Sequence, residues 1–310
     1  MTTADGTTAE GTSARDAGVL DRFWNMQAQW SRLADAKKRG VVRGRVLALA
    51  LIVLVAIVGA LSASIAVPHP TWGKGLAAAA AVCAALLPLL RPLFTGQVLV
   101  DFTVSRRIAE NTKSLVVGWL ALNGGSSATA DTRELQQEVR ELRLLAPELI
   151  AELDESVPAD SPLPPIKDLD SYLELRIREQ IDTYYRPRAR RIDRTLLILD
   201  RCSFSLSLLG ALLGALAVFW ERLLAGWIAV VTTIATALSA HIAASHYRFQ
   251  QLEFTRTAEQ LEQLILMATG TPAGELSQVV ADGEAIILGE NRAWQTTLSK
   301  PDGDDRDKAS

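Results

Sequence analysis

The sequence has little cysteine and histidine and none of the short motifs that mark common active sites. Its two cysteines, Cys83 and Cys202, form no CxxC pair, which excludes a disulfide framework and favours small apolar packing roles for both. Its three histidines form no HExxH motif, and there is no glycine-rich phosphate loop and no GxSxG nucleophile elbow. We therefore predict that the chain is not an enzyme, with no catalytic residue, no metal site and no cofactor.

Charge is almost absent from four apolar stretches, although the chain contains 32 Lys and Arg and 35 Asp and Glu. The stretches cover residues 46–67, 75–94, 202–220 and 223–245, and Arg91 in the second is their one charged residue. A helix rises 1.5 Å per residue, so each stretch can cross about 30 Å of hydrocarbon. Only short turns separate the first stretch from the second and the third from the fourth. The sequence thus predicts an all-α integral membrane protein with two transmembrane helical hairpins, four spans in total, and helical cytoplasmic extensions.

Composition divides the rest of the chain. Residues 1–20 are polar, rich in Thr, Ala and Gly, and lack the apolar core of a secretory signal, so we expect a disordered tail. The first hairpin unit covers residues 21–125, and residues 126–168 form a helical and proline-rich linker. The second hairpin unit covers residues 169–298, and a second disordered tail covers 299–310.

Basic residues are concentrated at the ends of the spans, and only Lys74 and Arg222 lie in the turns. Cytoplasmic loops carry an excess of Lys and Arg, so we predict that both termini and the central segment face the cytoplasm. No interleaved aromatic or glycine residues suggest a nucleic-acid surface, and we predict no nucleic-acid partner. A membrane-surface basic cluster in contact with anionic lipid is the interpretation that we favour. Its members are Arg186, Arg188, Arg190, Arg191 and Arg194.

A ten-residue pattern occurs after each predicted hairpin. RIAENTKSLV begins at residue 107 and RTAEQLEQLI at residue 256, an offset of 149 residues. Arg107 and Glu110, like Arg256 and Glu259, are three residues apart, a spacing that permits an ion pair of about 0.2–0.5 kcal/mol on a helix. We interpret the pattern as duplication of a hairpin followed by a cytoplasmic helix, with both pairs at matching places just below the membrane.

Small residues are spaced four apart in two of the spans. Gly59 with Ala63, and Gly210 with Gly214, form faces through which membrane helices can approach closely. Such a face serves either packing within one subunit or contact in a homo-oligomer, and the sequence leaves both open.

The second half of the sequence contains four distinctive runs: YLELRIREQIDTYYRPRARRID at 172–193, LLGALLGA at 208–215, GWIAVVTTIATALSAH at 226–241 and FTRTAEQLEQL at 254–264. These runs resemble the DUF4231 proteins of the SLATT families. The SLATT families are two-helix membrane effector domains associated with bacterial nucleotide-signalling and nucleotide-sensing systems. The resemblance covers most of residues 20–298 and is strongest in the second half, with the first half a more divergent copy.

The resemblance implies an effector of a bacterial defence or conflict system in the inner (plasma) membrane. Such an effector would oligomerise and form a pore or disrupt the membrane on a cytoplasmic signal, with a nucleotide-signalling protein as a partner besides the lipid bilayer. The alternative is a non-conducting scaffold or sensor subunit that recruits a cytoplasmic partner through its helical stalk.

Overall fold

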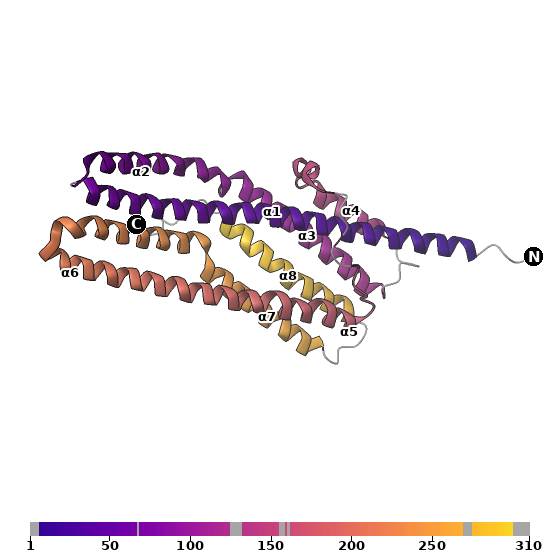
Figure 1. Cartoon of the computed structure of the whole chain (residues 1–310). Coiled ribbons are helices and arrows are strands. Elements are labelled where there is room, and N and C mark those ends of the chain that lie inside the picture. Colours follow the sequence, from indigo (N-terminus) through magenta and orange to yellow (C-terminus); the bar gives the residue numbers. More distant parts are fainter. Residues whose placement is uncertain are drawn as a thin grey trace, which may run out of the picture. The chain divides into compact units, whose positions relative to one another are not determined.

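The computed structural model describes residues 6–66, 68–124, 132–154, 159, 162–268 and 275–299 (Figure 1). These residues form helices and contain no strand, which confirms the predicted all-α class. They divide into two compact units. Unit 1 comprises Met1–Ala36, Val100–Ala189 and Leu252–Ser310, and unit 2 comprises Lys37–Leu99 and Arg190–Gln251.

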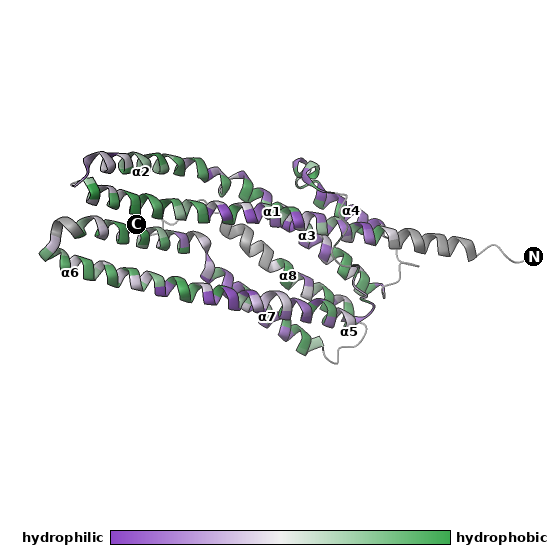
Figure 2. Ribbon diagram, viewed as in Figure 1, coloured by the Kyte–Doolittle hydropathy of each residue, from purple (hydrophilic) through white to green (hydrophobic). Residues whose placement is uncertain are grey.

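Four helices are long and apolar enough to cross a membrane, which confirms the number of predicted spans. They lie within Gly18–Ala66, Pro70–Leu122, Leu169–Trp220 and Leu224–Ala268. Figure 2 shows the second part of α1 (Gly6–Ala66), most of α2 (Pro70–Leu90) and both arms of α6 (Arg186–Ser245) coloured mainly as hydrophobic. The chain is a multi-pass membrane protein.

In unit 2, α1 and α2 form an antiparallel hairpin that packs at both of its ends. Near the turn, a Cβ on Gly73 would lie 2.6 Å from Ala66 Cα, so only glycine fits there. The Ser62 hydroxyl donates to the Gly73 carbonyl at 2.8 Å. At the open end, a Cβ on Gly44 would lie 3.0 Å from the Phe94 ring. The 3₁₀ helix η1 (Arg91–Leu93) and Gly96, with φ of 66°, then lead into α3 (Gln97–Leu122).

The second hairpin of unit 2 is α6, whose two arms meet at Trp220, where the backbone is not helical (φ −136°, ψ 47°). The break lies directly before residues 221–222, where the sequence predicts the turn. A Cβ on Gly210 would lie 3.5 Å from Val231 of the other arm, and a Cβ on Gly226 would lie 3.8 Å from Ala60 of α1. The fourth span ends at Ser245, because His246 takes a left-handed conformation with φ of 48° before α7 (Tyr247–Ala268) begins.

Unit 1 is a helical bundle. Besides parts of α1, α3 and α7, it contains α4 (Arg133–Arg143), η2 (Pro147–Glu152), α5 (Leu169–Tyr172) and α8 (Leu276–Ser299). Two π-helical segments, η3 (Leu173–Arg178) and η4 (Gln180–Tyr185), continue from α5. The largest buried side chains of its core include Trp30, Ile108, Val116, Tyr172, Ile177, Ile181, Leu261 and Ile287.

The first helix, α1, begins earlier than the first hairpin unit that composition predicts. α1 starts at Gly6, inside the segment 1–20 that we predict as a disordered tail. The helix continues without a break into residues whose apolar side chains are buried, such as Leu20 and Trp24. Packing of these side chains stabilises the helix, although the polar composition of residues 1–20 by itself predicts disorder. Residues 300–310 and parts of the predicted linker, 126–131, 155–158 and 160–161, lie outside the described residues.

Candidate functional site

A buried ion pair joins η3 to α8 in the core of unit 1. Arg176 Nε donates to Glu284 Oε1 at 3.0 Å, and Arg176 Nη2 donates to Glu284 Oε2 at 2.8 Å. The Tyr172 hydroxyl donates to the same carboxylate at 3.2 Å. The side chains of Arg176 and Glu284 are 3% and 8% exposed. A two-bond contact of this kind fixes both groups in one geometry.

Local sequence explains how these residues meet. Asp168 begins α5 as its N-cap, with its carboxylate accepting from Ser171 N at 2.8 Å. The π-helical η3 and η4 follow, a conformation often found at functional sites. α8 can approach only because residue 283 is glycine: a Cβ there would lie 2.5 Å from Tyr172 Oη and 3.1 Å from Ile177 and Leu264.

The electrostatics of the pair depend on burial. Burial opposes the charge on Arg176, but the adjacent Glu284 carboxylate outweighs it and raises the pKa of Arg176 above its ordinary value. Burial and Glu284 also raise the pKa of the Tyr172 hydroxyl, which stays protonated as a donor. Arg176 Nη1 is buried and makes no hydrogen bond within the part of the chain that the structure describes.

A second polar cluster, centred on Glu110 of α3, lies beside this pair. Glu110 forms an ion pair with Arg106 at 2.8 Å, and Arg106 donates to the Tyr184 hydroxyl at 2.8 Å. Arg188 stacks on the Tyr184 ring at 3.9 Å, and Lys113 Nζ lies 5.9 Å from the Trp24 ring.

Burial and charge act in opposite directions on Glu110. Burial opposes its ionisation, but Arg106, Lys113, Arg176 and Arg188 together hold its pKa below the ordinary value. Burial and the nearby Arg176 charge lower the pKa of Lys113, against the opposing effect of Glu110. The Arg176 charge thus acts on both Glu110 and Lys113, which couples the two clusters electrostatically within unit 1.

The ten-residue pattern that begins at Arg107 and at Arg256 is helical in both copies. Glu110 pairs with Arg106, four residues earlier, and not with Arg107, which the spacing also permits and which is exposed. Arg256 and Glu259 are exposed on α7. The burial pattern nevertheless repeats at the same offset of 149 residues: Ser105, Ile108, Ala109 and Thr112 match Phe254, Thr257, Ala258 and Leu261.

The predicted basic cluster divides between the two units. Arg186 forms ion pairs with Asp182, at 3.4 Å, and with Glu262, and Arg188 stacks on Tyr184, all within unit 1. The remaining members, Arg190, Arg191 and Arg194, are exposed and belong to unit 2.

The predicted small-residue faces are also in different environments. A Cβ on Gly210 would lie 3.5 Å from Val231, whereas a Cβ on Gly214 or Gly59 would meet nothing within 4 Å. Ala63 is exposed. Gly210 therefore packs within its own hairpin, and the other three positions present open faces.

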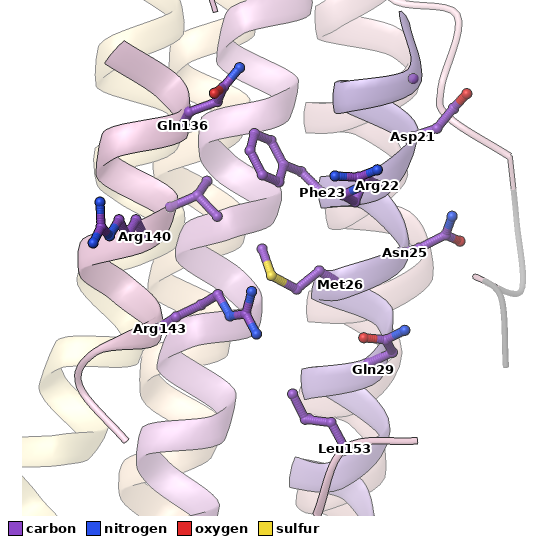
Figure 3. Close-up of a pocket in the computed structure, with 12 residues that line it drawn as sticks. Asp21, Arg22, Phe23, Asn25, Met26, Gln29, Gln136, Arg140, Arg143 and Leu153 are labelled. Atoms are coloured by element: carbon purple, nitrogen blue, oxygen red, sulfur yellow. The ribbon is translucent and has the colours of Figure 1, made fainter. Parts of the chain in front are cut away.

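A groove of about 640 Å³ lies in unit 1 between α1 and α4 (Figure 3). Phe23 and Met26 point from α1 into it, and Arg143 extends from α4 toward Met26 (Figure 3). Arg140 of α4 also lines the groove. Asp21 points away from these arginines (Figure 3). A groove with guanidinium groups at its edge and an apolar floor suits an anionic molecule, or an acidic protein segment, that also has an apolar part.

Sequence reasoning missed Tyr172, Arg176, Glu284 and Lys113. One signal was present: Glu284 stands one helical turn from Val280 and Ile287, an acid on an otherwise apolar helix face. Lys113 carries no such signal, because it becomes half-buried only through contacts with other helices.

Comparison with known protein families identifies the second half of the chain. Residues 172–294 match the family described as SMODS and SLOG-associating 2TM effector domain 1. A search of the curated proteins and a search of the solved structures found no match. The matched segment includes the second hairpin and all three residues of the buried cluster, Tyr172, Arg176 and Glu284.

Proposed function

We propose that this chain, which carries a SLATT domain over residues 172–294, is a membrane effector of a bacterial defence or conflict system. It would oligomerise in the inner membrane, with both termini cytoplasmic, and form a pore or disrupt the bilayer on a cytoplasmic signal. The observation that supports this most is the third span, inside the SLATT domain: none of the residues in its apolar window is buried. Lipid or other copies of the chain must cover that surface.

The polar side chains of the spans support a requirement for several copies. Thr232 and Thr233 bond to backbone carbonyls three or four residues earlier, as does Ser207 in the third span. A hydroxyl that bonds to its own helix can face lipid at little cost, so one chain needs no water-filled path to satisfy these groups. An aqueous path would be lined by several subunits, with the open faces at Gly59, Ala63 and Gly214 as the contacts.

The alternative is a non-conducting scaffold or sensor subunit. The groove of unit 1 favours it, because a basic, partly apolar groove outside the spans could hold an acidic segment of a partner. Both readings allow a nucleotide-signalling protein as a partner, and the matching family is described as associating with SMODS and SLOG. The two readings differ in whether the bilayer is breached.

Induced expression of the full chain in bacteria carrying a membrane-potential dye separates the two readings. An effector depolarises the cells and stops growth once its signal or sufficient protein is present. The Gly214→Leu variant, which adds bulk on an open face, serves as the matched control and should fractionate with the membrane without depolarising it. If the wild type causes neither depolarisation nor growth arrest under activating conditions, the scaffold reading replaces the effector reading.

A further inference from the structure

The small net charge of the chain conceals a separation of charge between the units. Unit 2 contains thirteen Lys and Arg but only three Asp and Glu. Unit 1 contains nineteen Lys and Arg and thirty-two Asp and Glu. All the basic residues of unit 2 except Lys74 and Arg222 lie near the open ends of the hairpins, away from the turns. The open ends lie at one end of unit 2, because the two hairpins lie close together near their turns. A Cβ on Gly226, six residues after the break at Trp220, would lie 3.8 Å from Ala60, six residues before the end of α1 at Ala66.

Seven arginines at this end are exposed and form no ion pair with any residue that the structure describes. They are Arg39, Arg43, Arg91, Arg190, Arg191, Arg194 and Arg201. The two acids of unit 2 at this end contact other residues than these arginines: Asp193 accepts from Gln251 at 3.0 Å, and Asp200 pairs with Arg248 at 3.6 Å. Compensation for these seven charges must therefore come from outside the described chain.

The neighbours of the arginines indicate the kind of partner. Leu197 and Ile198, 50% and 60% exposed, lie between Arg194 and Arg201. Val42 and Val46, 51% and 54% exposed, flank Arg43 in the same way. An anionic polymer such as nucleic acid would neutralise the arginines but leave these apolar side chains in water. A lipid leaflet provides phosphate groups for the guanidinium groups and acyl chains for the apolar residues at the same depth.

We propose that these seven arginines form a binding surface for the headgroups of anionic lipids at the open end of unit 2. Arg186 and Arg188 are not part of it, because their guanidinium groups are held by Glu262 and Tyr184 in unit 1. Binding of lipid headgroups at this surface does not depend on pore formation. The lipid-binding proposal and the proposed effector function can therefore each fail without the other.

The test uses the purified full chain in a non-ionic detergent, titrated with phosphatidylglycerol or phosphatidylcholine. Bound lipid is counted by native mass spectrometry, and thermal stability is followed by tryptophan fluorescence. Phosphatidylglycerol should bind and raise the melting temperature, with a smaller effect at high salt, while phosphatidylcholine should do neither. Each arginine near an anionic surface contributes about fivefold in affinity, so R190Q/R191Q should weaken phosphatidylglycerol binding about 30-fold.

The control variant K74Q/R222Q removes the same charge from the turns and should bind phosphatidylglycerol as the wild type does. If R190Q/R191Q does not fold, as judged by its melting temperature without lipid, R39Q/R43Q tests the same surface on the first hairpin. Equal binding of the two lipids, or unchanged phosphatidylglycerol binding by a folded arginine variant, would overturn the proposal. So would a labelled DNA duplex that displaces bound phosphatidylglycerol at physiological salt.

Discussion

Replacing Glu284 with glutamine tests whether the buried ion pair holds unit 1 together. The substitution keeps the size of the side chain and an oxygen that can still accept from the Tyr172 hydroxyl. It removes the negative charge that faces Arg176, whose side chain is only 3% exposed. Arg176 would then be a buried cation without a counter-ion in contact, and it already has one nitrogen, Nη1, with no hydrogen bond inside the described structure.

Removing one partner of a buried pair costs about 3–5 kcal/mol, because the remaining charge stays desolvated. For a unit of this size a loss of 1 kcal/mol lowers the melting temperature by about 2–4 °C, so E284Q should lower it by about 6–20 °C. The double variant R176M/E284M removes both charges and fills the space with apolar atoms. It should recover most of the loss, because apolar pairs of similar volume replace buried ion pairs at little cost.

The melting temperature can be followed by tryptophan fluorescence of the detergent-solubilised chain, since Trp24 and Trp30 are buried in unit 1. The matched control is E174Q, which removes an acid from the exposed Glu174–Arg178 pair on the same helical segment. That change should cost no more than about 0.5 kcal/mol. The reasoning is refuted if E284Q melts within 2 °C of E174Q, or if the double variant is as unstable as E284Q.

Three further predictions concern the spans, the pH dependence and the topology. Gly210→Leu should destabilise the second hairpin by about 1–3 kcal/mol, because Val231 already occupies the space. Gly214→Leu should leave the melting temperature of the single chain unchanged and alter only its oligomeric state, as measured by crosslinking. Equal destabilisation by the two substitutions would contradict this. The pKa of Glu110 is held below its ordinary value of 4.5, so its contribution to stability is complete above that pH and is lost as the pH falls through the lowered pKa. The melting temperature of the wild type should therefore fall more steeply below about pH 4.5 than that of E110Q, and parallel curves would show that Glu110 contributes nothing. A reporter inserted after Ala159 should be active only if it functions in the cytoplasm, and periplasmic activity there would overturn the topology.

The spans could be predicted from the sequence because their signal is local. A run of about 20 apolar residues can form few structures other than a membrane-spanning helix, and short turns force neighbouring runs into hairpins. The predicted end of the fourth span at residue 245 directly precedes the left-handed His246, and the predicted turn at residues 221–222 directly follows the break at Trp220. At these two points the apolar composition ends and the helical backbone breaks within the same few residues, so the sequence locates both boundaries.

The polar clusters could not be predicted because they depend on which helix face is buried. Both Arg106 and Arg107 are within reach of Glu110 on an isolated helix. In the fold, Ile108 and Ala109 are buried, which leaves Arg107 in solvent and places Arg106 against Tyr184, 78 residues away. Arg176 and Glu284 are 108 residues apart, and no local spacing relates them.

The close approach at Gly283 constrains how the sequence of this domain can vary during evolution. The atom nearest to a Cβ at position 283 is the hydroxyl oxygen of Tyr172, at 2.5 Å, while Ile177 and Leu264 lie at 3.1 Å and need move only slightly. A phenylalanine at position 172 would remove the blocking atom along with one donor to Glu284. Substitutions at the two positions are therefore coupled: among homologous domains, alanine at the equivalent of 283 should occur where the equivalent of 172 is phenylalanine, and glycine where it is tyrosine.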